Sequence, residues 1–183
     1  MSTPNRTTTS PKARRSPKPA TVREPADSRD LITAEVREIL DNFQLGNVLS
    51  HLLRRAHFLA EEMFAAEFAA EAVTPRQKAT LVILYQSPGL SQNALSDRLF
   101  MDRNTVAEMV RRLMSAGLVR RAPAKEDQRA YELYLADAGA RLLNAVMPRD
   151  LEVERRIAER LPPEYLPLFF KCLRLLIDPT AEK

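Results

Sequence analysis

The segment that begins at Asp102, DRNTVAEMVRRLMSAG, places hydrogen-bonding side chains on one side of a helix and apolar side chains on the other. At about 100° per residue, Val106, Met109, Val110 and Leu113 share the apolar side. The opposite side carries six other residues: Arg103, Asn104, Ala107, Glu108, Arg111 and Arg112. Such side chains can recognise base edges in a DNA major groove: Asn at adenine, Arg at guanine, Glu at cytosine, and Ala at the thymine methyl. For Glu108 the alternative is an ordinary ion pair with Arg112, four residues along the helix.

The elements before this helix are predicted from their capping residues. Thr74 and Pro75 are typical of a helix start, and that helix should end at residues 87–89, Ser-Pro-Gly. A second helix should start at Ser91 and bury Ala94, Leu95 and Leu99. A tight turn at residues 100–101 then leads to Asp102, which should cap the N–H groups of Asn104 and Thr105, and the helix should end at Gly117.

Two strands, residues 117–124 and 129–136, flank the polar loop KEDQ. A two-stranded hairpin cannot bury its own apolar side chains, so it should pack against the helices. Three short helices followed by such a hairpin indicate a winged helix-turn-helix.

Strongly apolar helices are predicted at both ends of this unit. Residues 31–43 should form a short helix, and residues 45–71 a long one. After the hairpin, a helix capped by Asp137 should be kinked or interrupted at Pro148, and the last helix should start at residues 162–163. The apolar residues exceed the needs of a small wing domain, which favours a partner subunit as their cover over packing within the chain.

The net charge of +4 is uneven along the 183 residues. Residues 1–30 hold seven Lys or Arg against three acids, and residues 98–129 hold eight against four. The second concentration favours a polyanionic partner over a merely solvated surface, because it coincides with the winged segment. The proline-rich basic arm, residues 1–30, could contact phosphates or serve as a solubilising tail.

Several functions find little support in the sequence. There is no apolar leader and no run of eighteen apolar residues, so we expect a cytoplasmic protein without a membrane span. The single cysteine, Cys172, and the only histidines, His51 and His57, make no metal-ligand pattern, and no nucleophile elbow or phosphate loop is present. We therefore expect no cofactor, metal or catalytic residue. Acid-base catalysis by a histidine and a winged helix that binds protein remain alternatives, which a salt titration of DNA binding would separate from DNA recognition.

A second group of polar residues interrupts the long N-terminal helix. It consists of His51, Arg54, Arg55 and His57, with Phe58 and Met63 beside them. The cations could receive a carboxylate or phosphate while the neighbours supply apolar contacts. Alternatively, they pair with Glu61, Glu62 or a partner chain.

The segments TPRQ, GLSQNALSDRL, DRNTVAEMVRRLMSAGLVRR and EDQRAYELYLADAGARLL together resemble the MarR family of bacterial transcription regulators. The resemblance covers about residues 45–178 and departs at Ala136-Asp137, where Thr-Pro is usual. It implies a homodimer that binds a pseudo-palindromic site on double-stranded DNA, most often as a repressor. It also implies that Arg129 enters the minor groove and that Asp127 helps to hold the wing. LLRRAH is similar to the subgroup that responds to aromatic acids or their coenzyme A thioesters, while Cys172 leaves redox sensing as an alternative.

The expected fold is mainly α, a winged helix-turn-helix with a two-stranded β wing and dimerisation helices at both ends. Its predicted parts are a basic arm (1–30), N-terminal dimerisation helices (31–73), the DNA-binding domain (74–136) and C-terminal dimerisation helices (137–183). The predicted DNA contacts are Ser91, Gln92, Asn93, Arg98, Arg103, Asn104, Thr105, Ala107, Glu108, Arg111, Arg112, Lys125, Asp127 and Arg129. The predicted ligand contacts are His51, Arg54, Arg55, His57, Phe58 and Met63.

Overall fold

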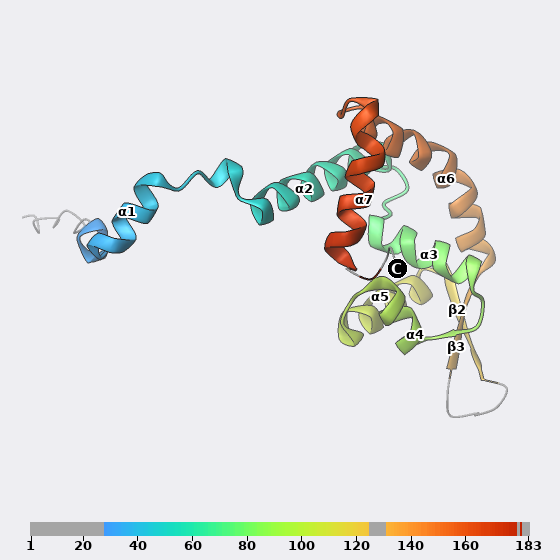
Figure 1. Cartoon of the computed structure of the whole chain (residues 1–183). Helices are drawn as coiled ribbons and strands as arrows, with labels where there is room; N and C mark the ends of the chain where they lie inside the picture. The colour runs from blue at the N-terminus through green and yellow to red at the C-terminus, as the bar shows by residue number, and fades with distance from the viewer. Residues whose placement is uncertain (1–27, 125–130, 179, 181–183) are drawn as a thin grey trace, which may run out of the picture. The chain divides into compact units, whose positions relative to one another are not determined.

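The computed structural model describes residues 28–124, 131–178 and 180. The chain divides into two units, residues 1–45 and 46–183. The described part of the first contains a short 3-10 helix, η1 (Ser28–Leu31), and α1 (Ala34–Asn42), whose N-cap Thr33 accepts a hydrogen bond from the Val36 N–H. No side chain of α1 is buried. Figure 1 labels α1.

The second unit is mostly helical. After η2 (Leu45–Asn47), which spans the boundary between the two units, its helices in chain order are α2 (Leu49–Glu67), α3 (Pro75–Gln86), α4 (Gln92–Leu99), α5 (Arg103–Ser115), α6 (Asp137–Ala158), η3 (Pro163–Tyr165) and α7 (Leu166–Ile177). Among the described helices, none is long and apolar enough to cross a membrane.

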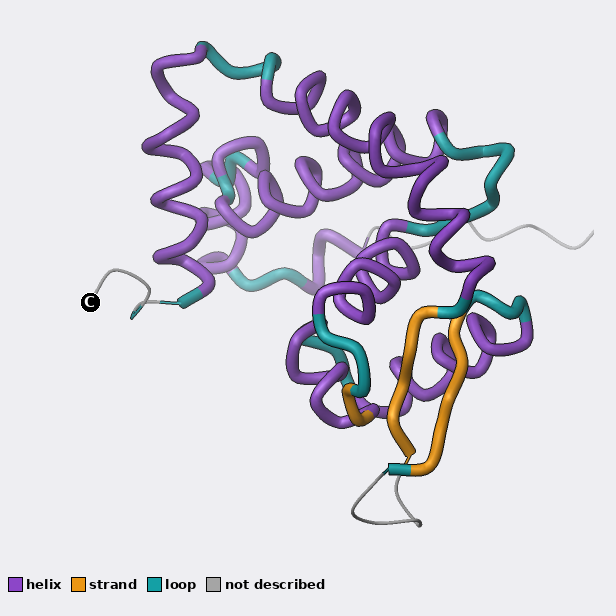
Figure 2. Tube along the Cα trace, turned by 90° about the vertical axis from the view of Figure 1, so that its right-hand side faces the viewer, coloured by secondary structure: helices purple, strands orange, loops and turns teal. Residues whose placement is uncertain are grey.

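Three antiparallel strands form one sheet in the order β1-β3-β2. The predicted hairpin consists of β2 (Val119–Pro123) and β3 (Tyr131–Leu135), with Val119 opposite Leu135, and its two strands lie side by side in Figure 2. The third strand, β1 (Leu90–Ser91), was not predicted; Leu90 pairs with Leu133. It ties the start of α4 to the sheet, so the predicted two-stranded wing is confirmed and the sheet holds one short strand in addition.

The principal core lies where α3, α4 and α5 meet the sheet. Leu81 and Leu84 of α3 and Leu95 of α4 are fully buried, and so is the predicted apolar side of α5. Burial of this stripe fixes which side of α5 faces outward. A second, smaller core joins Phe64 and Phe68 on α2 and near its end to α6.

The helix starts follow the predicted capping chemistry in most cases. Thr74 and Gln77 form a reciprocal capping box at α3, with Pro75 as the first helical residue, and Ser91 caps α4. The prediction for Asp137 was wrong: Ala136 occupies the N-cap, and Asp137 lies in the first turn, where a negative charge still favours the helix dipole. The helix was predicted to be kinked or interrupted at Pro148. It is not interrupted, because α6 continues through this proline.

Two residues with left-handed backbone and one close contact fix the chain around α5 and the start of α6. Phe100, between α4 and α5, has a left-handed backbone with φ of 51°, and Gly117 ends α5 with φ of 70°. Gly139, in the first turn of α6, lies so close to β2 that an added Cβ would be 2.3 Å from the Leu118 carbonyl oxygen. Glycine is therefore required where the first turn of α6 lies against Leu118, the residue before β2.

Candidate nucleic-acid interface

The outward side of α5 begins at a helix N-terminus that Asp102 caps. The Asp102 carboxylate accepts a hydrogen bond from the Thr105 N–H at 2.9 Å and another from the Thr105 hydroxyl at 2.5 Å. The bond from the Thr105 hydroxyl, helped by the one from its N–H, lowers the pKa of Asp102 below its usual 3.8. Thr105, predicted as a DNA contact, thus has its hydroxyl engaged in capping the helix.

The outward side of α5 matches the predicted set. Arg103, Asn104, Glu108, Arg111 and Arg112 are exposed, and Ala107 is half-buried. Arg112 donates to Glu108, and this bond lowers the pKa of the Glu108 carboxyl. Arg111 lies 3.7 Å from the same carboxylate. In the chain by itself, Glu108 therefore forms the helix ion pair that was the alternative to base recognition.

Residues of α4 complete the helix-turn-helix. Ser91 accepts from the Ala94 N–H at 3.2 Å as the N-cap, and Asn93 is exposed beside it. Arg98, at the other end of α4, donates to the Ser87 hydroxyl. Lys125, Asp127 and Arg129 lie outside the described residues, so the predicted wing tip stays a prediction.

A hollow of about 530 Å³ lies between α4, α5 and β2, and we call it the basic hollow. It brings Gln92 of α4 and Ala107 and Arg111 of α5 together with Arg121 of β2. The Arg121 guanidinium also lies over the Tyr131 ring, 4.6 Å from its centre. Two cations and a side-chain amide around one hollow can hold a phosphate.

Arg121 was not among the predicted contacts. Its neighbour Arg120 was missed as well, and its guanidinium lies over the Tyr134 ring at 4.5 Å. The RR pair was visible in the sequence, but its closeness to Arg111 depends on how β2 packs against α5. The local excess of positive charge in residues 98–129 was the sequence feature that could have indicated Arg120 and Arg121 as DNA contacts.

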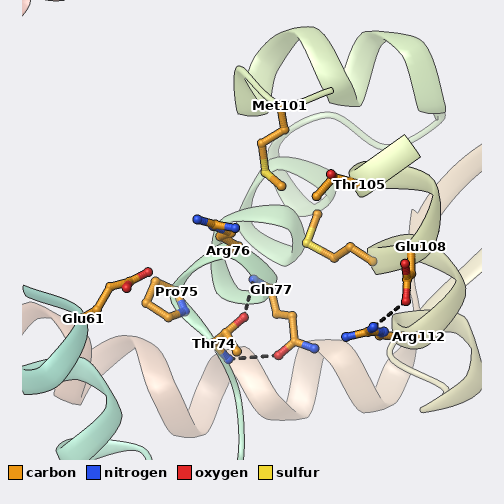
Figure 3. A pocket seen from close by; sticks show the side chains of 10 residues that line it. Glu61, Thr74, Pro75, Arg76, Gln77, Met101, Thr105, Glu108 and Arg112 are labelled. Atoms are coloured by element: carbon orange, nitrogen blue, oxygen red, sulfur yellow. Dashed lines mark hydrogen bonds and ion pairs between the residues drawn. The ribbon is translucent and has the colours of Figure 1, made fainter. Parts of the chain in front are cut away.

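A second depression runs between α2, the start of α3, and α5, and we call it the interhelix groove. It has two lobes of about 490 and 500 Å³, which share Glu61, Pro75, Arg76, Met101 and Thr105. The first lobe extends to Glu108 and Arg112 of α5 (Figure 3), and the second to His57 and Phe100. The groove therefore lies between α2 and α5.

Of the six predicted ligand contacts, His57 lines this groove. His57 Nε2 lies 3.4 Å from Glu61 Oε1, and its ring lies 6.0 Å from that of Phe58. His51, Arg54, Arg55, Phe58 and Met63 line neither lobe, and Met63 packs against the smaller core instead. Arg76 was missed, because its role depends on where α3 starts relative to α2. Its guanidinium forms no ion pair with another described residue.

Two other features of the described residues concern metal binding and the single cysteine. Within the described ranges, no group of three or more His, Cys, Asp or Glu side chains could hold a metal ion. Cys172 is free and exposed on α7.

Comparison with known proteins agrees with this geometry. A sequence profile of the MarR family matches residues 73–131. A putative transcriptional regulatory protein for the hcr operon of Thauera aromatica is 30% identical over 131 residues, covering 69% of this chain and 78% of that protein.

Two solved structures share the fold. The PcaV transcriptional regulator from Streptomyces coelicolor, in complex with its natural ligand, is 29% identical with a TM-score of 0.67, covering 76% of this chain and 98% of that chain. The transcriptional repressor CouR, bound to a 23-mer DNA duplex, is 26% identical with a TM-score of 0.65, covering 73% and 94% of the respective chains.

Proposed function

Since the chain belongs to the MarR family and is a DNA-binding transcriptional regulator, we propose that it is a repressor which a small aromatic acid, or the coenzyme A thioester of one, releases from its operator. The names of two relatives support the two halves of this proposal: CouR is a repressor bound to DNA, and PcaV was solved with a natural ligand. The observation that carries it is the interhelix groove, which reaches α5.

The operator is contacted through α5 and the elements beside it. Asn104 and Arg103, near the N-terminus of α5, meet base edges in the major groove. A sugar-phosphate strand separates this groove from the adjacent minor groove, where the wing and Arg129 would lie. The basic hollow lies between α5 and β2, so it is the place where that strand would pass. Arg111 and Arg121 then hold a phosphate, which gives Arg111 a positioning role in place of base recognition.

The effector site is the interhelix groove. Arg76, which forms no ion pair with a described residue, supplies a cation for a carboxylate or phosphate, and His57 supplies a second polar group. Phe100, 89% exposed at the turn, and Met101 supply apolar surface for a ring. Arg54 and Arg55, which form no ion pair with a described residue, remain available to the longer thioester from the exposed side of α2.

The ligand releases the protein from DNA if it binds more tightly to a conformation that cannot bind the operator. Two recognition helices must match the repeat of the major groove, so a small shift of α5 relative to α2 spoils the match. The ligand contacts both helices in this groove, and a coupling of about 1–3 kcal/mol is the usual size for such an effect.

A regulator of this kind requires two chains, and the apolar helices are the proposed dimer surface. On α7, Leu168 and Ile177 are 61% and 73% exposed, and Phe169 and Phe170 are 42% and 49% exposed. On α1, Val36, Ile39 and Leu40 are exposed too, and so is Phe43 at its C-cap. This much apolar surface is typical of an interface.

The test is release of a labelled operator duplex by a panel of aromatic acids and their thioesters, followed by fluorescence anisotropy. Arg76→Ala and His57→Ala should keep operator affinity and raise the concentration of any ligand needed for release, whereas Arg54→Ala should do so for the thioesters alone. Arg160→Ala, which removes an exposed arginine on the turn after α6, is the matched control. A panel that neither releases DNA nor raises the melting temperature would overturn the effector proposal. If Arg76→Ala and His57→Ala respond like the parent, the ligand binds elsewhere.

A further inference from the structure

Two adjacent arginines of β2, Arg120 and Arg121, lie on opposite faces of the wing hairpin, because successive side chains of a strand alternate between the faces of a sheet. In the register of the hairpin, Arg120 is opposite Tyr134 and Arg121 is opposite Leu133. Leu133 is buried in the principal core, so the face that it shares with Arg121 is turned toward the helices. Arg120 therefore lies on the face that is turned away from them.

Each of the two guanidinium groups lies over a tyrosine ring of β3. That of Arg120 is 4.5 Å from the centre of the Tyr134 ring, and that of Arg121 is 4.6 Å from the centre of the Tyr131 ring. Stacking on a ring restrains a long side chain while the edge of the guanidinium, with its N–H groups, can still donate to an oxyanion. The wing thus carries one restrained guanidinium on each face.

Tyr134, which supports Arg120, is itself fixed by its neighbours. Its hydroxyl donates to Glu132 Oε2 at 2.6 Å, and this bond raises the pKa of the phenol. A Cβ at Gly89, the residue before β1, would be 3.3 Å from the Tyr134 hydroxyl oxygen, so the chain passes close to this ring. Arg120 forms no ion pair with Glu132 or with another described residue. Its positive charge is therefore free to meet a partner.

We propose that Arg120 binds a DNA phosphate across the minor groove from the strand that Arg111 and Arg121 hold. Two sugar-phosphate strands border a minor groove, and a wing that enters it turns one face toward each of them. Arg121 faces the strand that passes through the basic hollow, so Arg120 faces the other one. Such contacts fix the position of the wing and carry no base preference of their own. The inference rests on the placement of the wing in the minor groove.

The salt dependence of DNA binding counts the phosphates that are held. The probe is a duplex that the full-length protein selects from a random library, and no effector is present. Arg120→Ala should weaken binding and lower the slope of log affinity against log salt by about one. With Arg121→Ala in addition, the slope should fall by about two, because two different phosphates are lost. Arg160→Ala, an exposed arginine on the turn after α6, should keep the parent's slope. An unchanged slope in Arg120→Ala overturns the proposal.

Phosphate ethylation interference on the same duplex assigns each contact to a strand, because an ethylated phosphate has lost its charge. Arg120→Ala should lose interference on one of the two strands that border the minor groove, and Arg121→Ala on the other. Loss of the same phosphates in both variants would overturn the proposal. If the wing does not enter the minor groove at all, Arg129→Ala binds like the parent. If only the role of Arg120 is wrong, Arg129→Ala is still weakened.

Tyr134 allows a positioned arginine to be told from a charge that is merely nearby. Tyr134→Phe keeps the ring and should bind DNA like the parent, whereas Tyr134→Leu removes the ring and should bind more weakly. In the Arg120→Ala background, Tyr134→Leu should cause no further loss of affinity. A general folding defect would weaken binding in both backgrounds alike and would contradict the positioning role of Tyr134, as would parental affinity in Tyr134→Leu.

Discussion

Lys78 Nζ donates to both carboxylate oxygens of Asp150 at 2.8 Å, joining the first turns of α3 to the middle of α6. The side chains are 17% and 5% exposed, so the pair is largely withdrawn from water. Lys78 also lies over the Phe64 ring of α2, with its Nζ 5.3 Å from the ring centre. One lysine thus fixes the position of α3 against two other helices, directly after Arg76 and Gln77 of the interhelix groove.

Removing one member of this pair should destabilise the protein strongly. Asp150→Ala leaves the Lys78 ammonium buried without its partner, and such changes cost about 3–5 kcal/mol. The double variant Lys78→Met with Asp150→Leu should regain most of that loss, because it leaves no buried charge. Urea unfolding at one fixed protein concentration measures both effects. A loss below about 1 kcal/mol in Asp150→Ala would show that the pair is well hydrated instead.

Local features of this chain could be predicted from the sequence, whereas contacts between distant residues could not. The four-residue apolar stripe of α5 and the start of α3 at Thr74 and Pro75 depend on near neighbours in the chain, and both are confirmed. Lys78 and Asp150 are 72 positions apart, and nothing in either segment indicates the other. The strand β1 has two residues, too few for any alternation to be visible.

The candidate sites divide in the same way. The outward side of α5 follows from the helix period alone, so Asn104 and Arg111 could be named in advance. Arg121 lines the same hollow as Arg111 only because β2 packs against α5, and Arg76 lines the same lobe as His57 only because α2 lies beside the start of α3. Pro148 was expected to break its helix, but α6 tolerates it. The chemical character of each side chain follows from the sequence. Which side chains lie around one site depends on the packing of the helices and strands.

Asn104 and Arg121 should have different effects on DNA binding. Asn104→Ala should reduce discrimination between operator and random duplex, by about 1–3 kcal/mol where the contact is bidentate to a base. Arg121→Ala should weaken binding to both duplexes alike and lower the slope of log affinity against log salt by about one. Anisotropy titrations at several salt concentrations measure both quantities. Loss of affinity in Asn104→Ala that is uniform across sequences would reassign Asn104 to phosphate contact.

Arg129→Ala should weaken operator binding while the free energy of unfolding stays unchanged. The reason is its predicted place at the wing, where a narrow minor groove attracts an inserted arginine. Arg141→Ala, an exposed arginine in the first half of α6, serves as the control. Equal operator affinity in Arg129→Ala and the parent would remove the wing from the mechanism.

Disruption of the apolar surface of α7 should produce monomers. Phe169→Glu with Ile177→Glu places two charges on the proposed interface, where burial without a partner is strongly unfavourable. Sedimentation at micromolar concentration should give the parent twice the mass of the variant. The parent should also protect two half-sites about one helical turn, roughly 10 base pairs, apart. A monomeric parent, or a footprint without twofold character, would contradict the dimer.

The capping of α5 by Asp102 should make stability depend on pH in a defined direction. Hydrogen bonds from Thr105 hold the folded-state pKa of Asp102 below 3.8, its value without these contacts. A carboxyl whose pKa is lower in the folded state stabilises the protein fully above the unfolded-state value, and this contribution is lost as the pH falls through the folded-state value. Asp102→Asn keeps a capping oxygen that does not titrate.

The measurement is the difference in unfolding free energy between the parent and Asp102→Asn from pH 7 to pH 3. Other carboxyls with lowered pKa values, such as Glu67 beside Arg149, are present in both proteins and cancel in this difference. The parent should be the more stable protein at pH 7, and its advantage should shrink once the pH falls below about 4. A difference that stays constant over the whole range would mean that the charge of Asp102 does not contribute to the cap.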